Sequence, residues 1–335
     1  MKLVTLIILV VLQLSACAEK PSQLEVVNGR TMGTSYSIKW PIQTIAFSPA
    51  DVQLQVDEVL SIIVSQMSTY DASSELSLFN RSPSPHSQDI SPEFAEVMAL
   101  SLKLNDLTNG FFDVSVGPLV NLWGFGPDKF PSVIPTSAQI SEAMSQTGLN
   151  GLKLQGTVLS KVNQRYIDLS AVAKGYAVDE VARLLEKIGI DNYLVEIGGE
   201  MYAKGEKGSG LLWNIAIEAP DLVARQVHKV LPVKDVAIAT SGDYRNYFEI
   251  EATRYSHSIN PKTGRPVEHT LASVTIIDDK CAKADALATA MLVMGIEKAK
   301  DFALINEVKA YMIVRNEQGK FEEFLTPAFT RWFNP

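Results

Sequence analysis

Asp285 and Thr289 are four residues apart in the stretch 284–290, whose Ala- and Leu-rich composition predicts a helix. Two side chains at this spacing project from one face of a helix. They supply two hard oxygen ligands, and Mg²⁺ is typically held by a few protein oxygens together with substrate phosphates and water. Taken alone, the pair is compatible with a magnesium site but does not establish one. The alternative is an aspartate in the first helical turn beside a threonine whose hydroxyl bonds the helix backbone.

A second polar stretch, residues 168–176, reads Asp-Leu-Ser-Ala-Val-Ala-Lys-Gly-Tyr and lies where an expected strand is followed by an expected helix. Such a junction presents unpaired backbone N–H groups at a helix N-terminus, which suit a phosphate or an ion. The alternative is that Asp168 or Ser170 only caps the helix. Taken alone, this stretch therefore leaves both interpretations open.

Three further stretches combine glycines with polar side chains. The two glycines of residues 196–200 permit a close approach of a ligand or another backbone, and a tight turn explains them equally well. Residues 240–246 indicate a turn or a loop rich in hydrogen-bond donors. Residues 255–266 form a loop by their Pro and Gly content, and His257 within it is suited to act as a general base. A lone histidine in a loop is also commonly a plain surface residue.

The composition restricts the possible classes of function. The 335 residues have a formal net charge of −8, and 46% are hydrophobic and 20% charged, as in ordinary soluble globular proteins. No block of basic residues is present, so nucleic acid is not an expected partner. The glycine fingerprint of dinucleotide-binding folds, the phosphate-binding loop, HExxH and GxSxG are all absent. The four histidines are too scattered in the sequence to indicate zinc.

The first 16 residues are expected to be an export signal. Lys2 precedes an apolar run over residues 3–14, which is too short for the roughly 20 apolar residues of a membrane span. The run ends in Leu-Ser-Ala-Cys and resembles the lipobox of bacterial lipoproteins, in which Cys17 carries the lipid. A plain secretory signal is the alternative.

The chain after the export signal is expected to consist of a short tether and one domain. Residues 17–25 are interpreted as a tether and residues 26–335 as one catalytic domain, because no low-complexity segment or repeat interrupts them. If Cys17 carries lipid, no disulfide is available within the chain. Cys281, the only other cysteine, lies at the head of an apolar helix and is expected to fill the core.

Start and stop signals predict the main helices. Ser48-Pro49 and Ser91-Pro92 open two of them, and Thr136 with Gln139 resembles a capping box for a third. Two more are expected over 172–187 and 282–294, ending before Gly189 and Gly295. Short apolar or β-branched runs predict strands over 193–197, 211–218, 237–240, 247–251 and 273–278, and a terminal hairpin over 310–324.

These elements do not alternate strictly as strand and helix. That order favours an α+β fold of mixed sheets and helices over a doubly wound parallel sheet. We expect a single catalytic unit of two closely packed lobes.

Taken together, the polar stretches resemble the ApbE family, the FAD:protein FMN transferases. The resemblance covers nearly all of the chain from about residue 26, and the motifs occur in the order of the family. In this sequence they read Met-Gly-Thr at 32–34, Met-Ser-Thr-Tyr-Asp at 67–71, Phe-Asp-Val-Ser-Val-Gly-Pro-Leu at 112–119, and the stretches at 168–179, 196–200, 240–248, 256–266 and 284–290.

The resemblance implies a set of site residues. Mg²⁺ would be held by the backbone carbonyl of Ala171 and by the side chains of Asp285 and Thr289, with His257 as the catalytic base. The implied FAD contacts are Met32, Tyr70, Phe112, Asp113, Val114, Asp168, Lys174 and Ile259. The rings of Tyr70 and Phe112 are expected to pack against the flavin or adenine ring. Asn260 departs from the family, which more often has Asp at that place.

The implied activity is Mg²⁺-dependent transfer of FMN from FAD to a threonine or serine hydroxyl of an acceptor flavoprotein, with release of AMP. Two alternatives remain: a Mg²⁺-dependent FAD pyrophosphatase that yields FMN and AMP, and a flavin-binding lipoprotein without catalysis. The expected acceptors are flavin-bearing subunits of electron-transfer complexes in the bacterial envelope. The expected location is lipid-anchored and periplasm-facing, on the inner membrane, although Ala18 and Glu19 after Cys17 are not a retention signal led by Asp.

Overall fold

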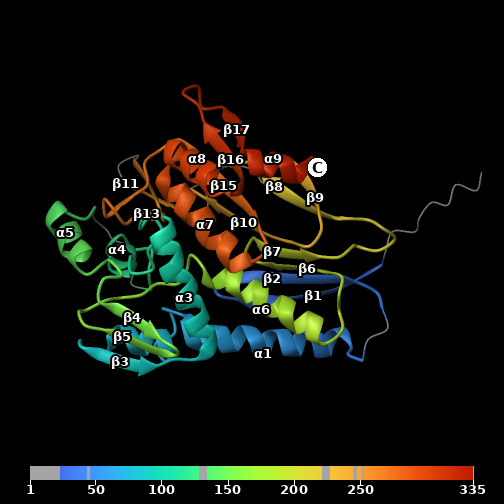
Figure 1. The fold of residues 1–335 in the computed structure, drawn as a ribbon, viewed down its shortest axis with the longest axis horizontal. Helices are drawn as coiled ribbons and strands as arrows, with labels where there is room; N and C mark the ends of the chain where they lie inside the picture. The colour runs from blue at the N-terminus through green and yellow to red at the C-terminus, as the bar shows by residue number, and fades with distance from the viewer. Residues whose placement is uncertain are drawn as a thin grey trace, which may run out of the picture.

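The computed structural model describes residues 23–43, 46–127, 134–220, 227–243, 247–250 and 253–334 (Figure 1). The expected signal peptide, Cys17 and most of the expected tether lie outside these ranges. Within the described ranges, none of the helices combines the length and the apolar character that crossing a membrane requires.

The helices begin where the capping signals predict. Ser48 and Thr136 each form a complete capping box, with Asp51 and Gln139 as the reciprocal partners. The helices are α1 Pro49–Met67, α2 Glu75–Arg81, α3 Pro92–Leu107, α4 Gly117–Leu122, α5 Ser137–Ser145, α6 Ala173–Lys187, α7 Cys281–Met294, α8 Ile296–Ile305 and α9 Pro327–Phe333. Gly295, at φ +73°, ends α7 as expected, and α8, which was not predicted, follows at once.

An eight-stranded sheet forms the centre of the molecule, in the order β1-β2-β6-β7-β10-β15-β16-β17, with every neighbouring pair antiparallel. The smaller sheets are β3-β5-β4 and the pairs β8-β9, β11-β12 and β13-β14. The strands of the large sheet are β1 Leu24–Thr31, β2 Thr34–Pro41, β6 Tyr193–Ile197, β7 Glu200–Lys204, β10 Val236–Gly242, β15 Leu271–Asp278, β16 Lys309–Arg315 and β17 Phe321–Leu325. The others are β3 His86–Asp89, β4 Leu152–Gln155, β5 Val158–Lys161, β8 Trp213–Glu218, β9 Val227–Val233, β11 Tyr247–Ile250, β12 Thr253–Ser256, β13 Ile259–Asn260 and β14 Arg265–Pro266. The α+β fold class is confirmed.

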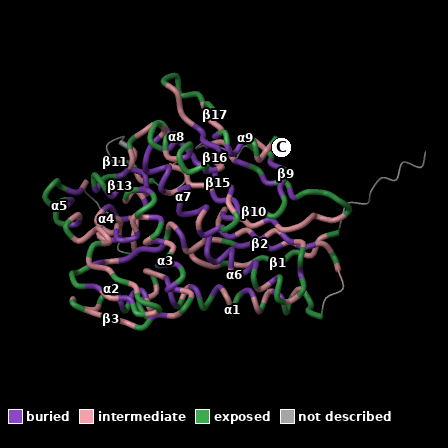
Figure 2. The backbone as a smooth tube through the Cα atoms, in the orientation of Figure 1, coloured by how far each residue is buried: buried purple, intermediate pink, exposed green. Residues whose placement is uncertain are grey.

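Both faces of the large sheet are covered. Along β10, Ala237 and Ala239 enter the core shared with α1, α3, α6 and α7, while Val236 and Ile238 enter a second core with β8, β9 and α9. This alternation follows from the two-residue period of a strand. Figure 2 shows the resulting band of buried backbone through α7, β10 and β15. The first core also contains Leu159 of β5, so the small sheet β3-β5-β4 packs on the same interior.

Helix α7 is the most deeply buried helix. All of its residues are buried except Lys283 and Thr289, because it packs against α6, β10 and β15 and its composition is apolar on every side. Cys281 at its start is fully buried, which confirms its expected place in the core. Burial raises the pKa of its thiol well above the ordinary value. A polar side chain on α7 is therefore exceptional.

Candidate functional site

The register of the large sheet brings two hairpin turns to the same end. Met32 and Gly33 connect β1 to β2 with φ values of +47° and +72°, and Gly198 and Gly199 connect β6 to β7 with +64° and +106°. Two-residue hairpin turns of this kind use positive φ. Because β2 pairs with β6, the Gly198 N–H donates to the Ser35 carbonyl at 3.1 Å, so the two turns lie side by side.

Met32 adopts a backbone conformation that non-glycine residues rarely take. The left-handed region is costly for a side chain with a Cβ atom, and such residues gather at functional sites when the surrounding structure fixes them. Here the fixed hairpin register holds it. Its side chain is partly buried against the main core. That Met32 contacts FAD stays a prediction.

The start of α6 meets α7 at very short range. Gly175 donates its backbone N–H to Asp285 Oδ2 at 3.0 Å, and this N–H is one of the first in α6, which have no acceptor within the helix. A Cβ atom on Gly175 would lie 2.7 Å from the Cys281 carbonyl carbon and 2.8 Å from Ala282 Cα. Glycine is therefore required for this contact. The DLSAVAKGY stretch and the ADALATA helix thus meet directly, as the sequence interpretation requires.

Asp179, one turn further along α6, caps α7 from outside. Its Oδ1 accepts the Cys281 N–H at 2.9 Å, and its Oδ2 accepts the Ala282 N–H at 3.0 Å. Burial raises the pKa of this carboxyl, whereas these two N–H groups act in the opposite direction. The carboxylate supplies the capping that Lys280, the residue at the N-cap of α7, does not provide. Its position therefore fixes the start of the helix that carries Asp285.

Asp179→Asn is expected to destabilise the fold by about 1–3 kcal/mol, because the amide retains only one oxygen for two buried N–H groups. The free energy of unfolding from urea titration measures this change. Asp301→Asn on the exposed surface of α8 is the control and should stay within about 0.5 kcal/mol. Equal stability of the two variants would contradict the capping role.

One cation faces two buried carboxylates at the entrance of α6. Lys174 Nζ lies 2.9 Å from Glu200 Oε1 and 3.7 Å from Asp285 Oδ2. Burial raises the pKa of the Glu200 carboxyl to about 7, although the Lys174 ammonium opposes that rise. Burial would lower the pKa of Lys174, but the charges of Asp285 and Glu200 raise it above the ordinary value. The Lys174 side chain is therefore held in its protonated, positively charged form.

Thr289 completes this region from the next turn of α7. The Thr289 hydroxyl lies 3.0 Å from the Ser241 hydroxyl near the end of β10. Asp285, one turn earlier on α7, is only 3% exposed. Within the described ranges, no group of three or more His, Cys, Asp or Glu side chains converges as a metal site would require. A cation here would therefore rely on hydroxyl and carbonyl oxygens in addition to the Asp285 carboxylate.

The predicted Asp168 and Val114 lie against each other. The Asp168 N–H donates to the Val114 carbonyl at 2.7 Å, and Asp168 Oδ1 accepts the Ser170 N–H at 2.8 Å. The stretch 112–114 therefore lies beside the strand-to-helix junction that leads into Ala171 and Lys174. The hydrogen bond to Ser170 shapes the junction ahead of α6. Neither Asp168 nor Ser170 caps α6, because its N-cap is Val172 and no side chain forms a cap hydrogen bond there, so the capping alternative is wrong.

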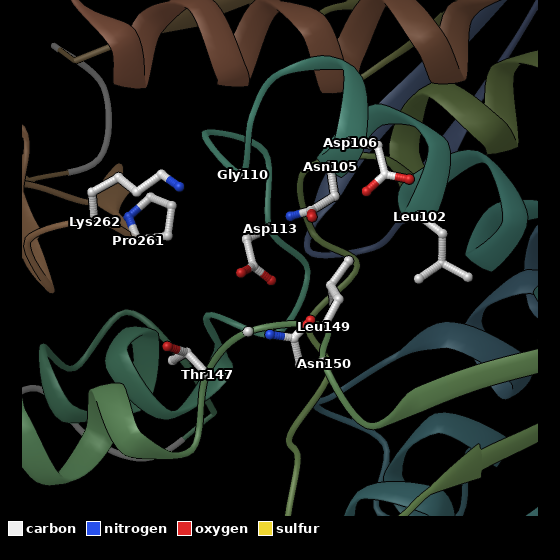
Figure 3. A pocket seen from close by; sticks show the side chains of 11 residues that line it. Leu102, Asn105, Asp106, Gly110, Asp113, Thr147, Leu149, Asn150, Pro261 and Lys262 are labelled. Atoms are coloured by element: carbon white, nitrogen blue, oxygen red, sulfur yellow. The ribbon is translucent and has the colours of Figure 1, made fainter.

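Asp113 belongs to a separate hollow of about 400 Å³. Its side chain points into this pocket, with Lys262 on the other side (Figure 3). Burial raises the pKa of the Asp113 carboxyl, against the hydrogen bonds donated by Ser115. The pocket is lined by Leu102, Asn105, Asp106, Gly110, Asp113, Thr147, Gly148, Leu149, Asn150, Pro261 and Lys262, which include none of the implied metal ligands.

Tyr70 and His257 both contact Phe125. The Tyr70 hydroxyl donates to the Phe125 carbonyl at 3.2 Å, and the His257 ring meets the Phe125 ring edge-on at 6.3 Å between centroids. The stacking continues from Phe125 to Phe248 at 5.1 Å. Tyr70 is 67% exposed, which leaves its ring accessible to a ligand. Partial burial together with the charge of Asp168 raises the pKa of its hydroxyl.

Two predicted FAD contacts are buried in the protein. Phe112 is 2% and Ile259 6% exposed. The ring of Phe112 is enclosed in the main core and is not open to a flavin or adenine ring in this structure, and its contact with FAD stays a prediction. Its neighbour Phe111 is only partly buried, and the ammonium of Lys298 lies 5.2 Å from the centre of its ring.

The arrangement matches a known family. The ApbE family model matches residues 32–312, which span every polar stretch described above. The chain belongs to the ApbE family. Among curated proteins of the family, the FAD:protein FMN transferase of Vibrio cholerae is 44% identical over 325 residues, covering 97% of each chain. The FAD:protein FMN transferase of Escherichia coli K12 is 38% identical over 329 residues, covering 93% of this chain and 92% of that protein.

Solved structures of ApbE proteins share the fold. The flavin transferase ApbE from Vibrio cholerae superposes with a TM-score of 0.86 at 43% identity, over 93% of this chain and 99% of that one. The apo flavinyl transferase ApbE of Pseudomonas stutzeri gives a TM-score of 0.86 at 38% identity, over 94% and 98%. The α+β fold of this chain is therefore the ApbE fold along nearly its whole length.

Sequence reasoning missed three polar side chains of this ApbE site. Glu200 was assigned only to a turn, Ser241 only to a donor-rich loop, and Asp179 had no predicted role. Asp179 carries one recognisable signal, because it is an acidic residue directly after the buried apolar residues 176–178. Glu200 lacks that signal, since its neighbours Gly199 and Met201 are only partly buried. Ser241 carries no such signal, because only the packing of α7 on β10 brings it to Thr289.

Proposed function

We propose that the chain transfers FMN from FAD to a threonine or serine hydroxyl of an acceptor protein and releases AMP. Family membership supports this proposal, together with curated relatives of that name that match it over nearly their whole length. The structural observation that carries it is the convergence of Lys174 and Asp285 at the start of α6, with Thr289 one turn further along α7. This group lies beside the two hairpin turns that include Met32 and Gly198.

The reaction is proposed to use Mg²⁺, and the residues fit that ion. In the described part of the chain, both contacts to the Asp285 carboxylate go to Oδ2, so Oδ1 is left for a ligand. Thr289 supplies a hydroxyl, and Ala171, just before the N-cap of α6, supplies a carbonyl at the same helix entrance. These are the hard oxygen donors that Mg²⁺ prefers. When bound, the ion supplies electrostatic stabilisation of the FAD diphosphate and of the charge that develops on it.

The protein groups have distinct tasks in the proposed reaction. The acceptor hydroxyl attacks the FMN phosphorus, the bond from that phosphorus to the bridging oxygen breaks, and AMP leaves. His257 takes the hydroxyl proton as general base. The Lys174 ammonium is placed to bind a phosphate oxygen, and the exposed ring of Tyr70 is placed to pack on a planar ring of the substrate.

His257→Ala is expected to slow FMN transfer by roughly 10²–10⁴-fold, the usual contribution of a general base. The measurement is mass spectrometry of an acceptor protein after incubation with enzyme, FAD and Mg²⁺, which reports a mass gain of one FMN. His86→Ala on β3 is the control and should transfer at the normal rate. A His257 variant as fast as the control would refute the base assignment.

The same measurement separates the alternatives. AMP and free FMN without a modified acceptor would identify an FAD pyrophosphatase, in which water replaces the protein hydroxyl. FAD that binds and stays intact under all conditions would identify a flavin-binding protein without catalysis. Modification of the acceptor at a threonine or serine supports the transferase.

We further propose that the enzyme is anchored by lipid on Cys17 at the periplasmic side of the bacterial envelope, where flavin-bearing subunits of electron-transfer complexes are its acceptors. The Leu-Ser-Ala-Cys stretch supports this, and Cys17 lies outside the described residues. Cys17→Ser is expected to move the protein from the membrane pellet to the supernatant in cell fractionation, and to abolish incorporation of labelled palmitate. A pelleted, labelled variant would contradict the anchor.

A further inference from the structure

Glu200 holds the Lys174 ammonium more closely than Asp285 does, although both carboxylates lie within ion-pair distance of it. Lys174 Nζ forms a hydrogen-bonded ion pair with Glu200 Oε1 at 2.9 Å, while its distance to Asp285 Oδ2, 3.7 Å, is beyond hydrogen-bond reach. Among the described residues, Lys174 is the only cation within ion-pair distance of either carboxylate. How closely Lys174 approaches each of the two carboxylates therefore determines how much of the negative charge of Asp285 is neutralised.

The backbone around Glu200 holds its carboxylate close to Lys174. Glu200 is 4% exposed and is the first residue of β7, paired with Ile197 across the Gly198-Gly199 turn. A Cβ atom at Gly198 would lie 3.4 Å from both Glu200 Oε2 and Lys174 Cδ, so the bare turn packs directly over the ion pair. Burial and the close approach of the turn therefore restrict the movement of the carboxylate away from Lys174.

The second oxygen of Glu200 gives an independent sign of a ligand nearby. Glu200 Oε2 is buried and has no hydrogen-bond partner among the described residues. A buried carboxylate oxygen without a partner is costly unless the site gains something in return. If stability alone had shaped this position, an apolar residue would avoid that cost. The charge at Glu200 is therefore explained by its effect on its neighbours.

We propose that Glu200 is a positioning residue of the metal site, which draws the Lys174 ammonium away from Asp285 and so keeps the Asp285 carboxylate available to a divalent cation. This inference rests on the proposed function, because it takes Asp285 as a metal ligand. The same arrangement would leave the ammonium beside a cation held by Asp285, so that a diphosphate substrate could contact both. Without Glu200, Lys174 would close on Asp285 and compete with the metal.

Direct metal binding tests this proposal. The full-length protein is titrated with Mn²⁺ as the probe, and free Mn²⁺ is measured by electron paramagnetic resonance without FAD. Glu200→Gln is expected to raise the Mn²⁺ dissociation constant about 10- to 100-fold, the usual effect of losing a side chain that orients a metal ligand. Glu196→Gln is the matched control in the same hairpin: its oxygen still accepts the Gly199 N–H, and its affinity should be unchanged.

A double variant distinguishes competition from damage to the fold. Removing the competing cation in Glu200→Gln/Lys174→Met should restore Mn²⁺ affinity to the level of Lys174→Met alone. Weak binding that persists in the double variant would overturn the inference, since Glu200 would then act through its own charge on the metal or by supporting the hairpin, and not by holding Lys174. Glu200→Gln with normal affinity would overturn it as well.

Asp285→Asn separates this inference from the proposed function. If that variant loses Mn²⁺ binding while Glu200→Gln keeps it, the metal site stands and the role of Glu200 fails. If Asp285→Asn binds Mn²⁺ as the unaltered protein does, the proposed metal site itself fails, and the role of Glu200 fails with it.

Discussion

Asp285→Asn is expected to reduce FMN transfer by about a thousand-fold or more, because it removes the one carboxylate of the proposed metal site and metal stabilisation amounts to several kcal/mol of the barrier. The asparagine oxygen can still accept the Gly175 N–H, and Lys174 keeps Glu200 as its partner, so the α6–α7 contact is expected to persist. The measurement is the single-turnover rate of acceptor modification, followed by mass spectrometry at saturating FAD.

The control for this variant lies on the same stretch of chain. Asp279→Asn removes an exposed carboxylate just before α7 and should transfer FMN at the normal rate. The urea midpoint of Asp285→Asn should lie close to that of the unaltered protein. A stable Asp285→Asn variant with full activity would exclude the proposed metal site, whereas an unstable one would assign the effect to folding.

Gly175→Ala is expected to destabilise the protein by about 1–3 kcal/mol, the usual cost of overpacking. The added methyl group would meet the backbone of Cys281 and Ala282, which cannot rotate aside as a side chain can. The gain in helix propensity from glycine to alanine is at most about 1 kcal/mol and does not offset this clash. The free energy of unfolding from urea titration measures the sum.

This variant should also lose activity in its folded state. Separation of α6 from α7 would break the Gly175–Asp285 hydrogen bond and displace Asp285 from Lys174. A misplacement of about 1 Å costs roughly 10²-fold in rate when catalysis depends on positioning. Ser61→Ala on the exposed side of α1 is the control for an added alanine and should leave stability and transfer unchanged. Normal activity in Gly175→Ala would show that the helix contact does not position the site.

The elements with local signals were predictable from the sequence. The capping boxes of α1 and α5, the proline at the start of α3 and the glycine after α7 all act within one helical turn, so the sequence itself contains them. The hairpin of β16 and β17 and the absence of strict strand–helix alternation were also correct. The meeting of the DLSAVAKGY and ADALATA stretches followed from the family resemblance and is confirmed by the Gly175–Asp285 hydrogen bond.

Features that depend on register or on distant packing were not predictable. Strand β1 has no clean alternation of buried and exposed residues, so no periodicity in its sequence predicts it. Strand β2 does alternate, with Tyr36, Ile38 and Trp40 buried between polar residues, and this two-residue period is a signal that the strand prediction did not use. The pairing of β2 with β6, which brings Met32 to Gly198, is a property of the folded sheet. The burial of Phe112 could not be told from an exposed aromatic by residue type alone. Glu200 acquires its significance only through Lys174, which lies 26 positions earlier in the sequence.

The contacts that build the candidate site join segments that are far apart in the sequence, and this affects the stage of folding at which the site forms. Gly175 and Asp285 are 110 residues apart, Asp179 and Cys281 are 102 apart, and Ser241 and Thr289 are 48 apart. Each such closure costs chain entropy before its contact forms, so contacts of this span form late in folding. A growing or partly folded chain in which α7 is not yet docked has neither the Asp285 contact nor the Thr289 contact. Competence to bind substrate therefore coincides with completion of the fold, and an unfinished chain has no functional site to expose.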